Sequence, residues 1–219
     1  MLNTDNITIN THSSIRIEGS KVIYFDPFEI ADDKHDADVI FVTHDHYDHF
    51  DVRSIGCIAK ADTIIVAPES IARQVVAKAG IAESNCVFME PDSLATVEGL
   101  EVEAVPSYNR MKPFHPKGKK YLGFVVAMDG VRYYVAGDTD VNDDIVKVKC
   151  DVALVPVGGT YTMDAKAAAE LIAQIKPQVA IPTHYGSIAG KGGDGLKFAE
   201  KVTEKNTDGS GEITVQIKL

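Results

Sequence analysis

Apolar residues in the first third of the chain recur with the period of β-strands. The segment 38–43 is a largely continuous apolar run, which is typical of a strand buried on both faces. The other runs alternate β-branched or aromatic residues with polar ones, and Gly19-Ser20 marks a hairpin turn between two of them. The pattern predicts strands over residues 7–10, 14–18, 21–25 and 38–43.

Strand and helix patterns alternate along the rest of the chain. Apolar residues at helical spacing predict helices over 51–60, from Pro68 to Gly80, over 164–175 with Asp164 as a cap, and over 195–204. Extended runs predict strands over 63–67, 86–88, 94–97, 100–105, 121–128, 131–136, 152–155, 178–181 and 212–218, with Asp129-Gly130 as a tight hairpin. Residues 106–120 form a long basic loop without periodicity. The alternation indicates an α/β protein, and without a linker or repeat we expect one domain over residues 1–219.

Composition and charge narrow the classes of partner. Asp and Glu number 32 against 22 Lys and Arg, so the formal net charge is −10. Nucleic-acid-binding proteins normally carry a basic surface, and anionic membranes also attract positive charge, so neither partner is expected. The three cysteines are scattered singly, and no secretory signal or membrane-spanning run is present, so we expect a cytoplasmic protein.

Histidine and aspartate residues concentrate directly after the apolar strand 38–43. The stretch from Thr43 to His49 spells H-x-H-x-D-H, and the chain has only seven histidines. Imidazoles crowded at the end of a strand repel one another when protonated and are costly to bury without partners. A divalent cation removes both problems, because it binds neutral imidazole and anionic carboxylate. The candidate ligands in this stretch are His44, His46, Asp48 and His49.

Two later strands also end at potential metal ligands. One runs into Asp138 and another into His184. Because parallel strands of one sheet end at a common edge, we expect both residues to join the histidine cluster. Asp26 ends an earlier strand, and we expect it to accept the outer N–H of a ligand imidazole and fix its tautomer.

These motifs resemble those of the metallo-β-lactamase-fold hydrolase superfamily. The shared features are the H-x-H-x-D-H block, a later Gly-Asp after a strand, a late Thr-His-Tyr-Gly and an N-terminal I-x-F-D-P-like segment, and they extend over residues 7–219. Within the superfamily the chain is most similar to the compact bacterial and archaeal branch that includes ascorbate-6-phosphate lactonase relatives. The resemblance implies a four-layer αβ/βα sandwich with metals at one edge of two facing sheets.

The resemblance also implies which residue binds which metal. One ion would take His44 and His46, the other Asp48, His49 and His184, and Asp138 would bridge them. The family's third histidine of the first site belongs near residues 107–109, where this chain has Ser107, Tyr108 and Asn109. Either His115 from the long loop replaces it, or the first site lacks a ligand. One or two divalent ions are therefore expected, zinc first, with manganese or iron as alternatives.

A divalent ion lowers the pKa of coordinated water and polarises the substrate, so the expected chemistry is hydrolysis. We expect Asp48 and His184 to act in catalysis, with Asp48 orienting the water and accepting its proton. The lysines and arginine of loop 106–120 favour a small anionic ester, lactone or phosphodiester. Residues expected to contact substrate or to support the ligands are Asp26, His12, Asn109, His115, Lys112 and Tyr161.

Other interpretations stay open at this point. One is an RNA-processing nuclease of the same fold, which the net charge disfavours. A second is a non-catalytic metal-binding module whose first site is incomplete. A redox role is weaker, because di-iron relatives usually carry a Glu in the first block, where this chain has Asp45 and Tyr47. The sequence also leaves the oligomeric state open, a homo-oligomer included.

Overall fold

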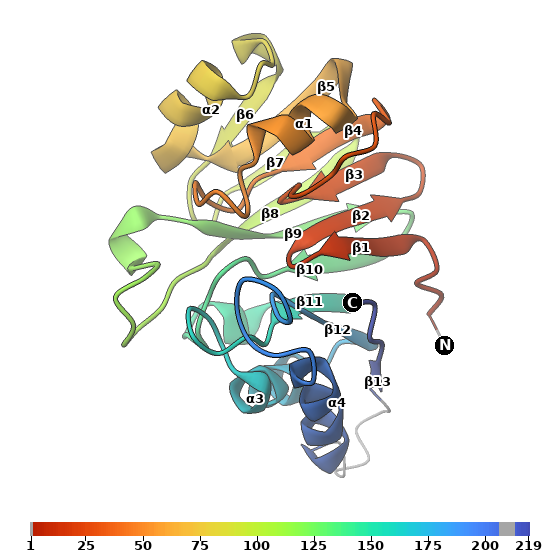
Figure 1. Ribbon diagram of the computed structural model, residues 1–219, viewed down its shortest axis with the longest axis vertical. Helices are drawn as coiled ribbons and strands as arrows, with labels where there is room; N and C mark the ends of the chain where they lie inside the picture. The colour runs from red at the N-terminus through yellow and green to blue at the C-terminus, as the bar shows by residue number, and fades with distance from the viewer. Residues whose placement is uncertain (1, 206–212) are drawn as a thin grey trace.

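Two β-sheets form the centre of the protein in the computed structural model, which describes residues 2–205 and 213–219 (Figure 1). Within these residues, the first sheet holds six strands in chain order. Its first three strands pair antiparallel and the remaining neighbours pair in parallel. The strands are β1 (Ile7–Thr11), β2 (Ser14–Glu18), β3 (Val22–Phe25), β4 (Ala37–Phe41), β5 (Ala59–Pro68) and β6 (Cys86–Met89).

The second sheet has seven strands in the described part of the chain, in the order β13-β12-β11-β10-β9-β8-β7. Strands β10 to β13 run parallel, and β7 to β10 form an antiparallel meander. The strands are β7 (Leu94–Val97), β8 (Leu100–Pro106), β9 (Leu122–Met128), β10 (Val131–Val135), β11 (Val152–Pro156), β12 (Val179–Thr183) and β13 (Thr214–Val215).

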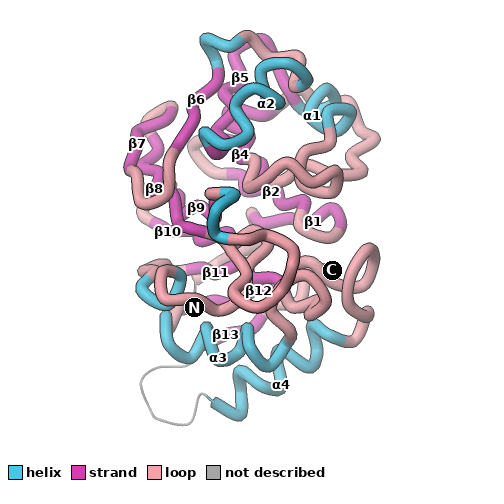
Figure 2. The backbone as a smooth tube through the Cα atoms, turned by 90° about the vertical axis from the view of Figure 1, so that its left-hand side faces the viewer, coloured by secondary structure: helices cyan, strands magenta, loops and turns pink. Residues whose placement is uncertain are grey.

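Helices cover the outer face of each sheet. In both Figure 1 and Figure 2, α1 and α2 lie at one end of the molecule and α3 and α4 at the other, with the strands between them. The α-helices are α1 (Val52–Ile58), α2 (Ala72–Lys78), α3 (Ala165–Ile175) and α4 (Asp194–Lys205), and short 3-10 turns occupy Glu69–Ile71, Glu83–Asn85, Lys117–Lys119 and Ile145–Lys147. No helix in residues 2–205 and 213–219 is long and apolar enough to cross a bilayer.

The alternation of side chains along β4 shows why the molecule has four layers. Val39 and Phe41 point into the core between the two sheets, where Phe41 stacks on Phe25 with 4.7 Å between ring centroids. Ile40 and Val42 point the other way, into a separate core shared with α1 and α2. A strand covered on both faces must be apolar at successive positions, as the sequence of 38–43 is. The expected α/β sandwich is therefore confirmed.

Most predicted elements form, but the predicted helix over 51–60 is too long. Asp51 caps α1 by accepting hydrogen bonds from the backbone N–H groups of Arg53 and Ser54, and the helix ends at Ile58. Strand β5 begins at the next residue, four residues before the predicted strand. Thr63 anchors this earlier start, because its hydroxyl donates to the Ala37 carbonyl at 2.6 Å.

Three further segments differ from prediction. The segment after Pro68 starts as a 3-10 turn before α2, and Gly80 follows the helix with a φ of +71°. Loop 106–120 contains one 3-10 turn and a bridge between Asn109 and Pro116. The closing strand is only β13, and residue 212 of the predicted strand lies outside the described residues. Asp164 does cap α3, as predicted, by accepting from the N–H of Ala167.

Candidate metal centre

The segments that follow β4, β10 and β12 meet at one edge of the two sheets. The turn after β4 carries the H-x-H-x-D-H block, and Asp138 and His184 follow β10 and β12. Gly137 permits the turn into Asp138, since its φ is +63° and a Cβ there would lie 3.0 Å from Cβ of Thr43. All six predicted ligands thus come together: His44, His46, Asp48, His49, Asp138 and His184.

One group of potential ligands consists of three imidazoles. Nδ1 of His46 lies 3.1 Å from Nε2 of His44 and 3.1 Å from Nε2 of His115. Nitrogens bound to one tetrahedral zinc at about 2.0–2.1 Å lie roughly 3.3 Å apart, so both of these spacings suit such an ion. His115 from the long loop thus lies with His44 and His46, as the first of the two alternatives requires.

A second group of potential ligands combines three imidazoles with a carboxylate, and it consists of His12, Asp48, His49 and His184. Oδ2 of Asp48 lies 3.2 Å from Nε2 of His12, 3.5 Å from Nε2 of His49 and 3.8 Å from Nε2 of His184. The sequence suggested only a supporting or pocket-lining role for His12. The structure instead buries it completely and places it among the potential ligands, in the turn between β1 and β2.

Asp138 connects the two groups. Its Oδ1 lies 3.3 Å from Nε2 of His49, and its Oδ2 lies 3.1 Å from Nε2 of His184 and 3.4 Å from Nε2 of His115. This is the position expected of a bridging carboxylate.

Several polar atoms that face this centre have no hydrogen-bond partner, although they are buried. Burying such groups without a partner is costly, and native structures rarely do so. Because the unpaired atoms are imidazole nitrogens and a carboxylate oxygen directed at one another, a cation is the group that fits the cluster. The atoms are Nε2 of His12, Nε2 of His49, Oδ1 of Asp138 and Nε2 of His184.

Asp26 fixes the orientation of two potential ligands from behind, as predicted for one. This buried carboxylate accepts hydrogen bonds from the backbone N–H and hydroxyl of Thr43, and from Nδ1 of His49, each at 2.7 Å. Because the Thr43 hydroxyl donates its hydrogen bond to Asp26, its oxygen accepts a hydrogen bond from Nδ1 of His44 at 2.9 Å. Both imidazoles therefore present Nε2 to the centre.

The electrostatics of the cluster suit metal ligands. Burial holds the pKa of His44 well below its usual value and lowers the pKa of His115 to about 4, so both imidazoles are neutral. Burial opposes ionisation of Asp138, but His184 and His49 outweigh it and hold the carboxyl pKa well below its usual range. Burial likewise opposes protonation of His49, yet Asp138 and Asp26 raise the pKa of that imidazole. Neutral imidazole and ionised carboxylate are the forms that bind cations, so His44, His115 and Asp138 are already in their binding forms, whereas His49 gives up a proton when it binds.

Four residues of the site adopt left-handed backbone conformations, a feature that the sequence did not reveal. His12, Asp26, His115 and His184 have φ values between +45° and +57°. Non-glycine residues rarely adopt such angles, and they persist where surrounding contacts impose them. One such contact joins the sheets, because the N–H of His184 donates to the carbonyl of His12 at 2.9 Å.

The remaining predicted residues have different roles. Tyr161 lines the cavity above the cluster. Asn109 is buried and braces the loop of His115, since its amide donates to the carbonyls of Phe114 and Tyr161 at 2.9 and 2.6 Å. The ammonium group of Lys112 is bonded to Asp140 and to the carbonyl of Thr162, so it does not face the cavity.

A bonded trio around Asp45 was missed by sequence reasoning. Asp45 accepts from the hydroxyl of Tyr121 at 2.5 Å and from the amide of Gln74 at 2.6 Å. These bonds lower the pKa of Asp45 although burial opposes them. The ring of Tyr121 lies 5.1 Å from that of His44, so the trio supports the histidine turn from the side of α2. No local signal links the three positions in the sequence.

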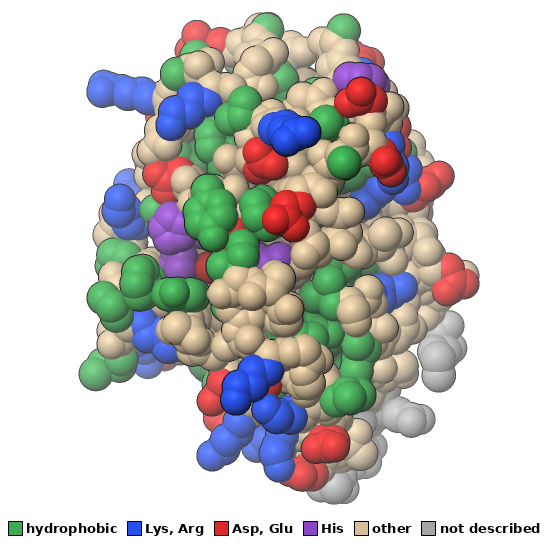
Figure 3. Space-filling model, viewed as in Figure 1, with side chains coloured by type: hydrophobic (Ala, Val, Ile, Leu, Met, Phe, Trp, Pro, Cys, Tyr) green, Lys and Arg blue, Asp and Glu red, His purple; other side chains and the backbone are tan. Residues whose placement is uncertain are grey.

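A cavity of about 430 Å³ opens onto the cluster. On the face shown in Figure 3, hydrophobic side chains lie beside exposed histidine. The residues that line this cavity are Asp45, His46, Tyr47, Asp48, Phe114, His115, Asp138, Tyr161, His184 and Ile188.

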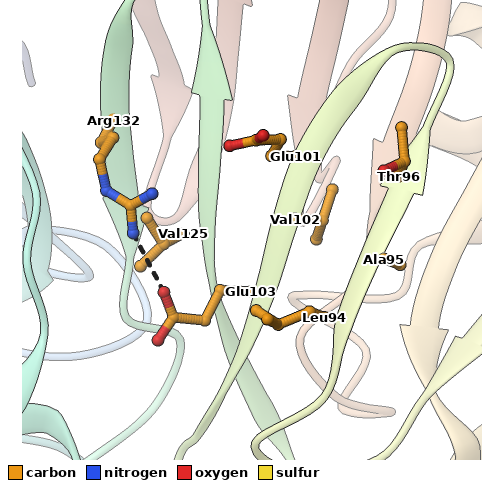
Figure 4. Close-up of a pocket in the computed structure, with 8 residues that line it drawn as sticks. All are labelled: Leu94, Ala95, Thr96, Glu101, Val102, Glu103, Val125 and Arg132. Atoms are coloured by element: carbon orange, nitrogen blue, oxygen red, sulfur yellow. Dashed lines mark hydrogen bonds and ion pairs between the residues drawn. The ribbon is translucent and has the colours of Figure 1, made fainter.

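Another hollow lies on strands β7 to β10 and is crossed by an ion pair between Arg132 and Glu103 at 3.0 Å (Figure 4). Its lining residues in the described chain include no histidine or cysteine, so this hollow offers a metal ion no imidazole or thiolate ligand.

Comparison with known proteins identifies the family. Residues 6–184 match the family model described as the beta-lactamase superfamily domain. The chain belongs to the beta-lactamase superfamily. Among curated superfamily members, it is 33% identical over 213 residues to the UPF0173 metal-dependent hydrolase of Pyrococcus furiosus, covering 91% of this chain and 92% of that protein. It is 32% identical over 207 residues to the corresponding protein of Thermococcus kodakarensis, covering 89% and 90%.

The solved structures agree with this assignment. A crystal structure from Parabacteroides distasonis superposes with a TM-score of 0.79 at 30% identity, covering 97% of this chain and 92% of that one. The resemblance inferred from the motifs and the two-sheet superfamily fold are therefore both confirmed.

Proposed function

We propose that this protein is a metal-dependent hydrolase that cleaves a small ester, lactone or phosphodiester. The observation that carries the proposal is the buried cluster of imidazole and carboxylate atoms without hydrogen-bond partners, open to a cavity on one side. The superfamily relatives that carry the name metal-dependent hydrolase support it.

Two groups of side chains would hold the ions. His44, His46 and His115 would bind one, and Asp48, His49, His184 and His12 the other, with Asp138 between them. The all-nitrogen first group favours zinc, with manganese or iron as alternatives at the oxygen-containing second group. When bound, divalent ions supply Lewis-acid activation of water and stabilise negative charge on the substrate.

Asp48 has the position of the proton acceptor. Its carboxylate lines the cavity while its Oδ2 contacts His12, His49 and His184. Burial opposes ionisation of Asp48, but the contact with His12 and the charge of His49 lower its pKa, so Asp48 is ionised and can accept a proton. In the overall step water adds its oxygen to the electrophilic centre, the bond to the leaving oxygen breaks, and the proton passes to that oxygen.

Elemental analysis followed by a substrate screen tests the proposal. The purified protein should contain between one and two transition-metal ions per chain and hydrolyse at least one ester, lactone or phosphodiester. Asp138→Ala should lose both bound metal and hydrolysis while its circular dichroism spectrum is retained. A metal-free protein, or a metal-loaded protein inactive on all three classes, contradicts the proposal and favours the non-catalytic metal-binding interpretation.

A further inference from the structure

Large hydrophobic side chains surround the mouth of the cavity and face solvent. Tyr47 is 66% exposed, Phe114 45% and Ile188 38%, and each lines the cavity together with Tyr161. These four residues are here called the apolar rim. Tyr47 follows β4, Phe114 precedes β9, Tyr161 follows β11 and Ile188 follows β12. Apolar side chains gathered around a concave polar site are typical of small-molecule pockets.

The apolar rim is held in place. The rings of Phe114 and Tyr161 meet edge to face, with centroids 4.9 Å apart and an angle of 90°. The single amide of Asn109 bonds the backbone carbonyls of both residues. Tyr47 makes a similar edge contact with Phe28 at 6.0 Å. An ordered surface of this kind binds a ligand with little loss of side-chain entropy.

The side chains that line the cavity include no positively charged residue in the described chain. Four of the five cations of loop 106–120 pair with carboxylates outside the cavity, and no Lys or Arg is among the residues that line the cavity in the described chain. The lining of the cavity therefore offers no lysine or arginine to an anionic substituent. The pairs are Arg110–Asp143, Lys112–Asp140, Lys117–Asp144 and Lys120–Glu90.

We propose that the substrate carries an apolar substituent, an aromatic ring or a short alkyl chain, which packs on the apolar rim while its ester, lactone or phosphoester group reaches the metal centre. This inference rests on the proposed function and adds the substrate class to it. The cavity of about 430 Å³ suits a small molecule of this kind.

Binding of two phosphonates isolates the contribution of the substituent. Phenylphosphonate and methylphosphonate share one head group that binds metal and is not hydrolysed, and they differ only in the apolar part. By calorimetry with the zinc-loaded protein, phenylphosphonate should bind at least about tenfold more tightly, as expected when a ring is buried. Equal affinities, or no binding of either compound, overturn the inference.

Rim variants locate the effect. Phe114→Ala and Tyr47→Ala should each reduce the preference for phenylphosphonate at least about threefold while leaving metal content and methylphosphonate binding unchanged. Met111→Ala is the matched control, because Met111 is an apolar residue of the same loop, 93% exposed and outside the cavity lining. A preference that survives both rim variants, or that Met111→Ala removes equally, overturns the assignment to the rim.

The ester assay separates this inference from the proposed function. Phenyl esters should have higher kcat/KM than matched esters with a carboxylate on the substituent. If phenylphosphonate is preferred but no ester, lactone or phosphodiester is cleaved, the proposed function fails and the apolar rim remains a ligand site. If esters are cleaved but neither pair shows a preference, the proposed function remains and the inference is wrong.

Discussion

Nε2 of His115 lies 3.1 Å from Nδ1 of His46, although 69 residues separate the two along the chain. Removing this imidazole leaves the first group with His44 and His46 only. We expect His115→Ala to weaken binding of one zinc ion at least about tenfold, because three nitrogens hold zinc far better than two. Elemental analysis after dialysis against a weak chelator measures this. His35→Ala, at an exposed position, is the control, and an unchanged zinc content in His115→Ala would show that His115 is no ligand.

His12 tests the second group separately. Its Nε2 lies 3.2 Å from Asp48, and its Nδ1 is 3.2 Å from the hydroxyl of Ser187. We expect His12→Ala to lower occupancy of the second ion while the first remains bound. Ser187→Ala, which keeps the imidazole but removes its outer contact, should have a smaller effect. Metal titration with a chromophoric competitor resolves the two sites, and loss of both ions or of neither from His12→Ala would contradict this division.

Asp26 acts on the metal through His49. Asp26→Asn keeps the shape of the side chain but removes the charge that accepts from Nδ1 of His49 at 2.7 Å. Loss of such an outer partner typically weakens metal binding about 10- to 100-fold, and we expect this range from competition with a chelator. Asp32→Asn, on the exposed surface, supplies the matched charge change. Equal affinities in Asp26→Asn and Asp32→Asn would remove Asp26 from the supporting role.

The histidine block and the strand ends were predictable because each is a local signal. The run 38–43 is buried on both faces, and the residues directly after it must lie at the sheet edge, so His44 and His46 follow from position alone. The place of His115 was not predictable. It depends on how loop 106–120 folds back. Asn109 fixes this fold by donating to two backbone carbonyls, one of which, that of Tyr161, lies 52 residues further along the chain.

The sequence also did not reveal that Lys112 is bonded within the protein and turned away from the cavity, and the reason is related. A lysine in a loop next to a metal site is a reasonable anion ligand, but its partner Asp140 comes from the segment after β10. Pairing between loops depends on tertiary contacts, whereas the strand pattern depends only on neighbouring residues. The sequence therefore indicated the chemistry of the metal centre better than it indicated the substrate.

Metal removal should destabilise the protein. The buried nitrogens and oxygen that face the centre lack other partners, and a ligand that binds only the folded chain stabilises it by mass action. We expect a strong chelator to lower the Tm, and added zinc to restore it in a concentration-dependent way. Differential scanning calorimetry measures both. Asp138→Ala should show a much smaller chelator effect, and an identical Tm with and without chelator in the parent protein would contradict metal binding.

A carboxylate remote from the metal centre gives a pH test of the fold. Asp36 accepts from Arg16 and from the hydroxyl of Tyr24, each at 2.8 Å, and thereby ties β2 and β3 to the start of β4. Burial opposes its ionisation, but these two partners outweigh burial and lower its pKa. Because the folded pKa is below the unfolded value of about 3.9, the stabilisation is present above that value and is lost as the pH falls through the folded pKa.

Asp36→Asn should therefore reduce the free energy of unfolding by about 1 kcal/mol near neutral pH, a modest value because the pair is partly exposed. Urea denaturation at several pH values measures the difference between the variant and the parent protein. The difference should stay constant between about pH 7 and 5 and shrink below about pH 4, where the parent carboxylate takes up a proton. A difference that persists undiminished at the lowest pH where both proteins remain folded would show that charge at Asp36 contributes nothing, and that its hydrogen-bonding shape alone stabilises the first sheet.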